Sequence, residues 1–162
     1  MTPSVYVEST IPSFVVGEMS PVIVTAAHQI ATRQWWGEHR QDYRLYISRL
    51  VVQEISRGEP KLSRQRLALV ADLPQLVIVD RVLDFARELR TYLGLAHAAE
   101  QDAIHLAVAS HYRIDYLLTW NLAHLANGHV RRAIDRFHAR RGTYFPTICT
   151  PDELMGSENE YD

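Results

Sequence analysis

The sequence has almost no cysteine, almost no lysine and no long hydrophobic run. Cys149 is the only cysteine of the 162 residues, so no disulfide can form within the chain, and a reducing cytoplasm is the simplest expected location. No apolar run approaches the ~20 residues of a membrane-spanning helix, which predicts a soluble protein with no membrane association. Of the 17 basic residues only Lys61 is lysine. Arginine suits phosphate and carboxylate groups, although a genomic bias in composition explains the same count at least as well.

Repeats and linkers between domains are absent as well. A hydrophobic content of 47% and a charged content of 22% are typical of a globular protein with one core. The net charge of -2 argues against a strongly basic surface built for nucleic acid. We predict a single domain over residues 1–156, followed by an acidic tail over 157–162 that we expect to be mobile.

Short apolar segments alternate along the chain with segments that have helical periodicity. The pattern predicts strands over 5–7, 44–47, 76–79, 116–119 and 147–149, and helices over 22–36, 49–57, 63–72, 81–92, 97–111 and 130–141. Strands that are short, apolar and separated by helices are typical of a parallel sheet covered on both faces. The predicted fold class is α/β, with a mostly parallel central sheet sandwiched by helices. The first strand should have neighbours on both sides, with Val5 and Val7 buried.

The helix expected over 22–36 has an apolar face and ends in two tryptophans. The residues spaced for that face are Ile23, Ala26, Ala27 and Ile30. Trp35 and Trp36 are expected to cover the core or to form a partner surface. Together these apolar groups exceed what a small monomer usually exposes, so we predict a homodimer.

Polar side chains stand where several of the predicted strands end. Glu8 follows the first strand, Glu54 lies in the helix after the second, Asp102 lies early in the helix before the fourth, and Asn121 follows the fourth. Ligands of open parallel sheets bind beyond the carboxyl ends of the strands, where the strand order reverses. Converging carboxylates repel one another and are tolerated mainly around a hard cation such as Mg²⁺ or Mn²⁺. We therefore predict a metal site there, with the pKa of at least one carboxyl raised by repulsion.

Each acid alone also has an ordinary explanation. Glu8 could mark the exit of its strand into solvent, and Glu54 could pair with Arg57 on an exposed helix edge. Asp102 could be a first-turn acid that favours the helix dipole, an effect of ~0.3–1 kcal/mol. Only the three together indicate a site.

Four blocks of sequence, over 5–14, 52–58, 101–107 and 115–121, resemble the PIN domain family. The resemblance runs from residue 5 to residue 154. It is closest to a prokaryotic, VapC-like branch with Glu on the first strand and Thr-Trp-Asn after the fourth. It implies a PIN-like, Rossmann-like fold and a Mg²⁺- or Mn²⁺-dependent endoribonuclease that leaves a 5′-phosphate and a 3′-hydroxyl. It also implies the toxin of a type II toxin–antitoxin pair, with RNA as substrate, an antitoxin as partner and a two-fold homodimer.

The resemblance assigns the family's acidic positions to Glu8, Glu54, Asp102 and Asn121. In that assignment Glu8 and Asp102 bind the metal directly, and Glu54 holds or orients a metal-bound water. Asn121 offers its amide oxygen or positions a coordinated water. The family usually has Asp at the positions of Glu8 and Asn121. With three negative ligands in place of four, we expect weaker cation binding and weakened activity.

Three neighbours of these residues are candidates for supporting contacts. Ser9 and Thr119 are expected to donate hydrogen bonds to the metal ligands. His124, about one helical turn after Asn121, could face the same cleft and contact phosphate, although a lone histidine is more often an ordinary surface or core group.

Two alternatives stay open. The first is a PIN-like module that binds RNA or a protein partner without cleavage. Its binding surface would be a stripe of arginines on the last long helix, which can equally be a solvated face: Arg131, Arg132, Arg136, Arg140 and Arg141. The second is a metal-dependent phosphohydrolase, and the absence of a glycine-rich phosphate loop and of an early Asp-x-Asp counts against it.

Overall fold

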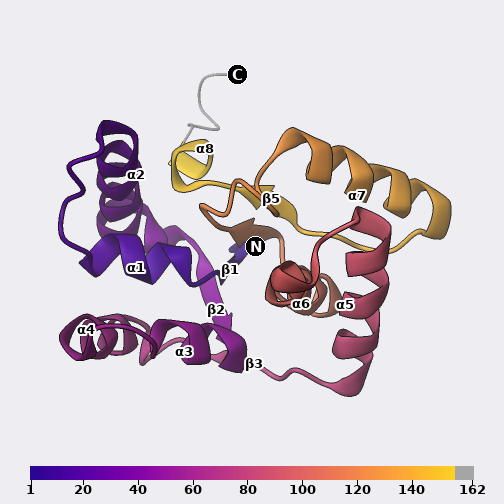
Figure 1. Ribbon diagram of the computed structural model, residues 1–162, viewed down its shortest axis with the longest axis horizontal. Coiled ribbons are helices and arrows are strands. Elements are labelled where there is room, and N and C mark those ends of the chain that lie inside the picture. The colour runs from indigo at the N-terminus through magenta and orange to yellow at the C-terminus, as the bar shows by residue number, and fades with distance from the viewer. Residues whose placement is uncertain (156–162) are drawn as a thin grey trace.

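The structure, a computed structural model, describes residues 1–155 and contains one five-stranded sheet (Figure 1). The strands are β1 (Ser4–Val7), β2 (Arg44–Ser48), β3 (Gln75–Leu76), β4 (Tyr116–Leu118) and β5 (Thr147–Cys149). Their order is β3-β2-β1-β4-β5, and every neighbouring pair is parallel. The predicted α/β fold class is confirmed. The predicted tail over 157–162 lies outside the described residues.

Strand β1 is the centre of the sheet. It pairs with β2 on one side and β4 on the other, and the side chains of Val5 and Val7 are fully buried, as predicted. The chain adds β2 and β3 on one side of β1 and then β4 and β5 on the other. The carboxyl ends of β1 and β4 therefore border the point where the strand order reverses, the expected location of a ligand.

Helices flank the sheet on two sides. They are α1 (Thr10–Val16), α2 (Ile23–Gln34), α3 (Arg49–Ile55), α4 (Pro60–Val70), α5 (Asp80–Leu93), α6 (Glu100–His111), α7 (Gly128–Arg141) and α8 (Pro151–Met155). A π-helical turn (Trp35–His39) and 3₁₀ turns (Arg40–Asp42 and His97–Ala99) complete the set. In Figure 1, α1 and α2 lie to the left of the sheet and α5 and α6 to its right. None of the helices within residues 1–155 is long and apolar enough to span a membrane.

Two segments differ from the sequence-based prediction. Helix α1 was not expected because Pro12 suggested a break, but Pro12 lies in the first turn, where its missing N–H costs nothing. The third strand was expected over 76–79 and instead covers only Gln75–Leu76, with Val77 and Val79 exposed. Strand β3 lies at the edge of the sheet, and only Gln75 and Leu76 pair with β2. The apolar residues that follow them make no strand pairing.

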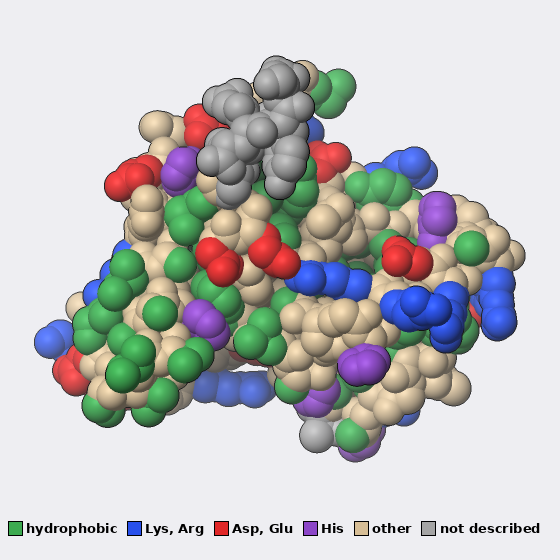
Figure 2. Space-filling model, turned by 90° about the horizontal axis from the view of Figure 1, so that it is seen from above, with side chains coloured by type: hydrophobic (Ala, Val, Ile, Leu, Met, Phe, Trp, Pro, Cys, Tyr) green, Lys and Arg blue, Asp and Glu red, His purple; other side chains and the backbone are tan. Residues whose placement is uncertain are grey.

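The apolar side of α2 faces solvent instead of the core. We call Val22, Ile23, Val24 and Ile30 the α2 apolar face; all four are exposed, Ile23 to 85%. Figure 2 shows hydrophobic side chains gathered on the side of the molecule where α2 lies. In contrast, Trp35 and Trp36 are buried in the core. Of the two roles expected for these tryptophans, covering the core is confirmed and forming a partner surface is wrong. The exposed apolar groups are those of the α2 apolar face.

An arginine side chain binds the outward-facing backbone carbonyl at the outer edge of β5. Thr147 N–H and Cys149 C=O bond toward β4, so the Ile148 carbonyl between them points away from the sheet. Arg131 donates from Nε to this carbonyl at 3.1 Å and from Nη2 to Glu153 at 2.8 Å. The edge carbonyl thus already has a partner within the chain.

Candidate metal centre

Glu8 lies at the carboxyl end of β1 and is almost fully buried, with 3% of its surface exposed. Its Oε1 accepts a hydrogen bond from Ser9 Oγ at 2.7 Å. Its Oε2 accepts from Thr10 N–H at 3.0 Å, from Thr10 Oγ1 at 2.5 Å and from Thr119 Oγ1 at 2.8 Å. Glu8 is therefore not a strand exit into solvent. Four donors from the first turn of α1 and the end of β4 stabilise and orient its carboxylate.

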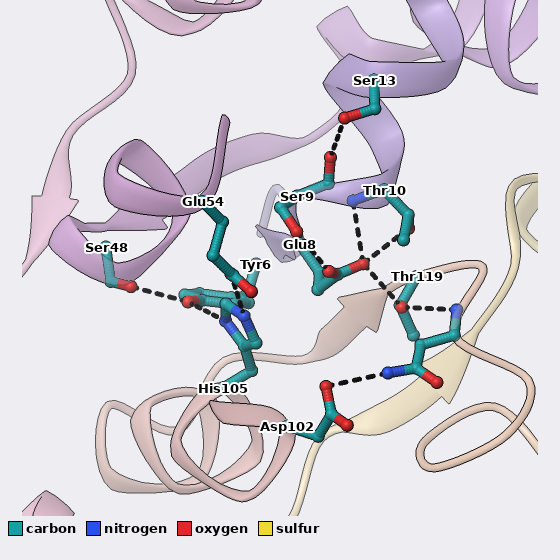
Figure 3. A network of polar contacts seen from close by, with 11 residues as sticks. Tyr6, Glu8, Ser9, Thr10, Ser13, Ser48, Glu54, Asp102, His105 and Thr119 are labelled. Atoms are coloured by element: carbon teal, nitrogen blue, oxygen red, sulfur yellow. Dashed lines mark hydrogen bonds and ion pairs between the residues drawn. The ribbon is translucent and has the colours of Figure 1, made fainter. Parts of the chain in front are cut away.

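Glu54, in the last turn of α3, meets a histidine that the sequence-based prediction missed. Glu54 Oε1 lies 2.6 Å from His105 Nε2, and the side chain of His105 is fully buried. His105 Nδ1 lies 2.8 Å from the hydroxyl of Tyr6, which lies 2.7 Å from Ser48 Oγ. A hydrogen-bonded chain thus runs from β2 through β1 and α6 to the carboxylate of Glu54 (Figure 3).

Glu8, Glu54 and His105 form what we call the inner group. Each offers one ligand atom, and these atoms all lie within 4.8 Å of one another. Within the described part of the chain, no other set of at least three histidine, cysteine or acidic side chains comes this close. Two carboxylates and an imidazole are a donor set that divalent cations accept, so these residues fit the metal that the sequence suggested.

Burial and nearby charges shift the pKa values of His105 and Tyr6. Burial alone would disfavour the imidazolium of His105, but the hydrogen bond and charge of Glu54, helped by Glu8 and Asp102, outweigh it and raise the pKa of His105. Burial raises the pKa of Tyr6 far above its usual range, against a smaller opposite effect of Ser48. Tyr6 is therefore a neutral hydroxyl at any physiological pH.

Asp102, Asn121 and His124 form a second cluster, the outer group. Asp102 Oδ1 accepts a hydrogen bond from Asn121 Nδ2 at 2.8 Å, and its Oδ2 lies 2.8 Å from His124 Nδ1. Asn121 Oδ1 in turn accepts from the backbone N–H of His124 at 3.1 Å. In this arrangement the amide nitrogen of Asn121 faces Asp102, and its oxygen supports the turn that follows β4.

The pKa of Asp102 is raised, in the direction expected for one of the acids, but from a different cause. We expected repulsion between carboxylates. Burial of Asp102 is the main cause instead, and the hydrogen bonds of His124 and Asn121 act against it. The carboxyl is thus partly removed from water and held by the side chains of Asn121 and His124.

Thr119, at the end of β4, connects the two groups. Its hydroxyl donates to Glu8 Oε2 and accepts from the backbone N–H of Asn121 at 2.9 Å. Hydrogen bonds therefore join Glu8, Asp102 and Asn121, whereas Glu54 belongs to the separate chain through His105 and Tyr6 (Figure 3). Asp102 is not among the three residues whose ligand atoms gather most closely, and His105 is.

Two sequence signals point to the missed residues. His105 follows Asp102 by three positions on α6, so both lie on neighbouring positions of one helix face. Tyr6 precedes Glu8 by two positions, and alternate residues of a strand point to the same side of a sheet. Both spacings are compatible with a shared site, but neither is specific enough to have predicted one.

The predicted arginine stripe on α7 is only partly available to a ligand. Arg131 bonds Ile148 and Glu153, and Arg141 pairs with Glu88 on α5. Arg132, Arg136 and Arg140 are exposed. Basic side chains gather over α7 at the right of Figure 2.

A cavity of about 700 Å³ lies between α7, α8 and β5 and contains none of the candidate metal-site residues. Tyr116, Arg131, Phe145 and Glu153 are among the residues that line it. The candidate metal centre is therefore separate from this hollow.

Comparison with known proteins supports the fold. No protein-family model matches this chain, and no curated protein sequence matches it either. Among solved structures, the chain is similar to one in the crystal structure of VapBC2 from Rickettsia felis bound to a DNA fragment from their promoter. The TM-score is 0.51 and the identity 11%, over 90% of this chain and 97% of that chain. At this identity the likeness concerns the arrangement of strands and helices.

Proposed function

We propose that the chain is a PIN-like, Mg²⁺- or Mn²⁺-dependent endoribonuclease that hydrolyses phosphodiester bonds of RNA. The observation that carries the proposal is the inner group, which brings the carboxylates of Glu8 and Glu54 together where the strand order reverses. Paired carboxylates in a partly dry position require a cation or several donors. The sequence resemblance to PIN domains and the structural likeness to a chain of the VapBC2 complex support the same reading.

Each side chain has a role in hydrolysis that follows from its position. Glu8 and Glu54 hold the cation, and Asp102 offers a third carboxylate beside them. A bound Mg²⁺ or Mn²⁺ supplies an acidified water and steadies charge on the phosphoryl oxygens. Glu54 accepts the proton of the attacking water or orients that water. Asn121 keeps Asp102 in place through its amide N–H.

The hydroxyls and His124 support these acids. Ser9 and Thr119 fix the orientation of Glu8 through the hydrogen bonds described above. The ring of His124 is 40% exposed beside Asp102, within reach of an RNA phosphate that approaches the acids. Three carboxylates in place of the four usual in the family make the cation weaker-bound and the enzyme slower.

A protein partner is part of the proposal, with the α2 apolar face as its binding surface. The similar structure is that of a VapBC2 complex, and by analogy we propose an antitoxin for this chain, in a cytoplasmic type II pair. Without it, we propose that the same face joins two copies into a homodimer. Light scattering of the wild type and of Ile23→Ser tests this. A wild type that stays monomeric at tens of micromolar, a working range for weak association, contradicts the homodimer.

Cleavage of a labelled single-stranded RNA tests the proposed activity. With Mn²⁺ or Mg²⁺ the wild type should cleave the RNA, and Glu8→Gln, which removes a ligand charge and keeps the shape, should lose cleavage. Asp84→Asn is the matched control, because Asp84 is exposed and pairs only with Arg87 on α5. Mn²⁺ should also raise the melting temperature of the wild type, since only the folded chain assembles the site.

The alternative is a module that binds RNA or a protein and cleaves nothing. The exposed arginines of α7 would then matter more than the acids. A wild type that cleaves no RNA with either metal, and whose melting temperature neither metal changes, would replace the nuclease proposal with this one.

A further inference from the structure

We propose that His105 is a nitrogen ligand of the cation in the inner group, so that the site favours a transition-metal dication such as Mn²⁺ over Mg²⁺. This inference rests on the proposed function and concerns the ligand set and metal preference of the same site.

The position of the imidazole fits this role. A ring nitrogen of His105 belongs to the cluster of ligand atoms that lie within 4.8 Å of one another, together with oxygens of Glu8 and Glu54. Nε2 lies 2.6 Å from Glu54 Oε1. Neighbouring ligands of a six-coordinate cation with bonds of about 2.1 Å are about 3 Å apart, so these two donors already have nearly the required separation.

The second ring nitrogen has the partner that a metal-bound histidine needs. Such a histidine usually donates its other N–H to a fixed acceptor, which sets the tautomer and the ring orientation. His105 Nδ1 faces the hydroxyl of Tyr6 at 2.8 Å, and this hydroxyl faces Ser48 Oγ at 2.7 Å. Tyr6 can accept from His105 and donate to Ser48. The chain of hydrogen bonds therefore survives when Nε2 binds a metal.

Metal preference follows from the donor atoms. Oxygen ligands suit Mg²⁺, whereas an imidazole nitrogen favours transition metals and places Mn²⁺, Co²⁺ and Ni²⁺ ahead of Mg²⁺. His124, the other imidazole beside a site carboxylate, does not belong to the inner group, and its ring faces only Asp102. It is the natural control.

Electron paramagnetic resonance of the Mn²⁺-loaded full chain tests the assignment. The pulsed spectrum of the wild type should show coupling of Mn²⁺ to a ¹⁴N nucleus. His105→Gln should lose this coupling, and His124→Gln should keep it. Calorimetry should show tighter binding of Mn²⁺ than of Mg²⁺ to the wild type, and the ratio of the two Kd values should fall in His105→Gln.

The outcomes separate this inference from the nuclease proposal. Bound Mn²⁺ without nitrogen coupling in the wild type, or coupling lost only in His124→Gln, overturns the role of His105 and leaves the nuclease proposal intact. Absence of Mn²⁺ binding overturns this inference, and the RNA cleavage assay then decides the nuclease proposal by itself. If His105→Gln does not fold, coupling that persists in His124→Gln supports the role of His105, and its absence from the wild type overturns it.

Discussion

The inner and outer groups both place a histidine against a carboxylate, yet they differ in what lies behind the histidine. His105 is fully buried and is hydrogen-bonded to Tyr6, which is in turn hydrogen-bonded to Ser48. The inner group is therefore attached to the central strands β1 and β2. The ring of His124 is 40% exposed, and its partner Asp102 is partly buried, with 16% of its side chain exposed. The inner group is thus part of the core, whereas the outer group is a local structure of one turn and one helix.

The groups also differ in how closely their carboxylates approach other carboxylates. Both oxygens of Asp102 already have donors, Asn121 and His124. The inner group leaves two carboxylates close together around one imidazole. A cation therefore has more to neutralise in the inner group, and the outer group can stay ordered without one.

The largest effect on stability should come from the anchor of the inner group. Tyr6→Phe removes the hydroxyl between His105 and Ser48 and leaves two buried polar groups without their partner. We expect a loss of about 1–3 kcal/mol in the free energy of unfolding, measured by urea denaturation without metal. Tyr46→Phe is the matched control, because Tyr46 is the register neighbour of Tyr6 on β2 and is only partly buried. Equal losses in both variants would remove the distinction between the groups.

Asn121→Asp should make the outer group depend on metal as well. Without metal, the new carboxylate replaces a donor to Asp102 with a like charge, which should destabilise the protein by about 1–2 kcal/mol. With Mn²⁺, the fourth acid should strengthen binding and enlarge the rise in melting temperature. Thermal denaturation with and without Mn²⁺ checks both signs. An unchanged metal effect would mean that the outer group does not reach the cation.

His124→Gln should cost less than about 1 kcal/mol, since exposed ion pairs contribute little. Urea denaturation compares this variant directly with Tyr6→Phe. A cost as large as that of Tyr6→Phe would show that the outer group is as firmly anchored as the inner group.

The smallest effect is on the pH dependence of the metal-free protein, and it separates the groups by pH range. Burial raises the pKa of Asp102, so folded protein retains this proton longer, and stability should fall as pH rises above the ordinary value of 3.8. The pKa of His105 is also raised: burial opposes its charge, but the hydrogen bond and charge of Glu54, together with Glu8 and Asp102, outweigh burial. The contribution of His105 to stability is therefore complete below the ordinary 6.5 and is lost at higher pH.

The melting temperature, measured in a metal chelator, should therefore decrease in two separate steps as the pH rises. Asp102→Asn should flatten the acidic one and His105→Gln the one near neutrality. If either variant flattens both steps, the two groups titrate as one unit.

The sequence predicted the fold because its strongest patterns are local. Apolar runs of strand length separated by helices require a covered parallel sheet, and the run at Val5–Val7 became its central strand. The ends of the strands place Glu8 and Asn121 near the point where the strand order reverses, where Thr119 links them to Asp102 and where Glu54 lies close to Glu8. This step needed only the general geometry of parallel sheets.

The features that the sequence did not predict depend on tertiary packing, which no local sequence pattern contains. The spacing of apolar residues on a helix does not tell whether that face packs on the core. The structure exposes Ile23 and Ile30 and buries the two tryptophans that the homodimer prediction had counted as exposed. His105 was missed because its role depends on how closely α6 packs against β1. Ser48 has the residue type and position of a cap for α3, yet its hydroxyl bonds Tyr6 and makes no cap contact.

The arginine that covers the edge of β5 also affects how the protein meets its own copies. A free edge strand can recruit a second molecule through backbone hydrogen bonds and so begin open-ended fibre growth. Here the outward carbonyl of Ile148 is bonded to Arg131, and the opposite edge of the sheet, β3, has only two residues. Association through the sheet is thus disfavoured at both ends. Side-chain packing on a helix, which produces closed and reversible assemblies, remains available.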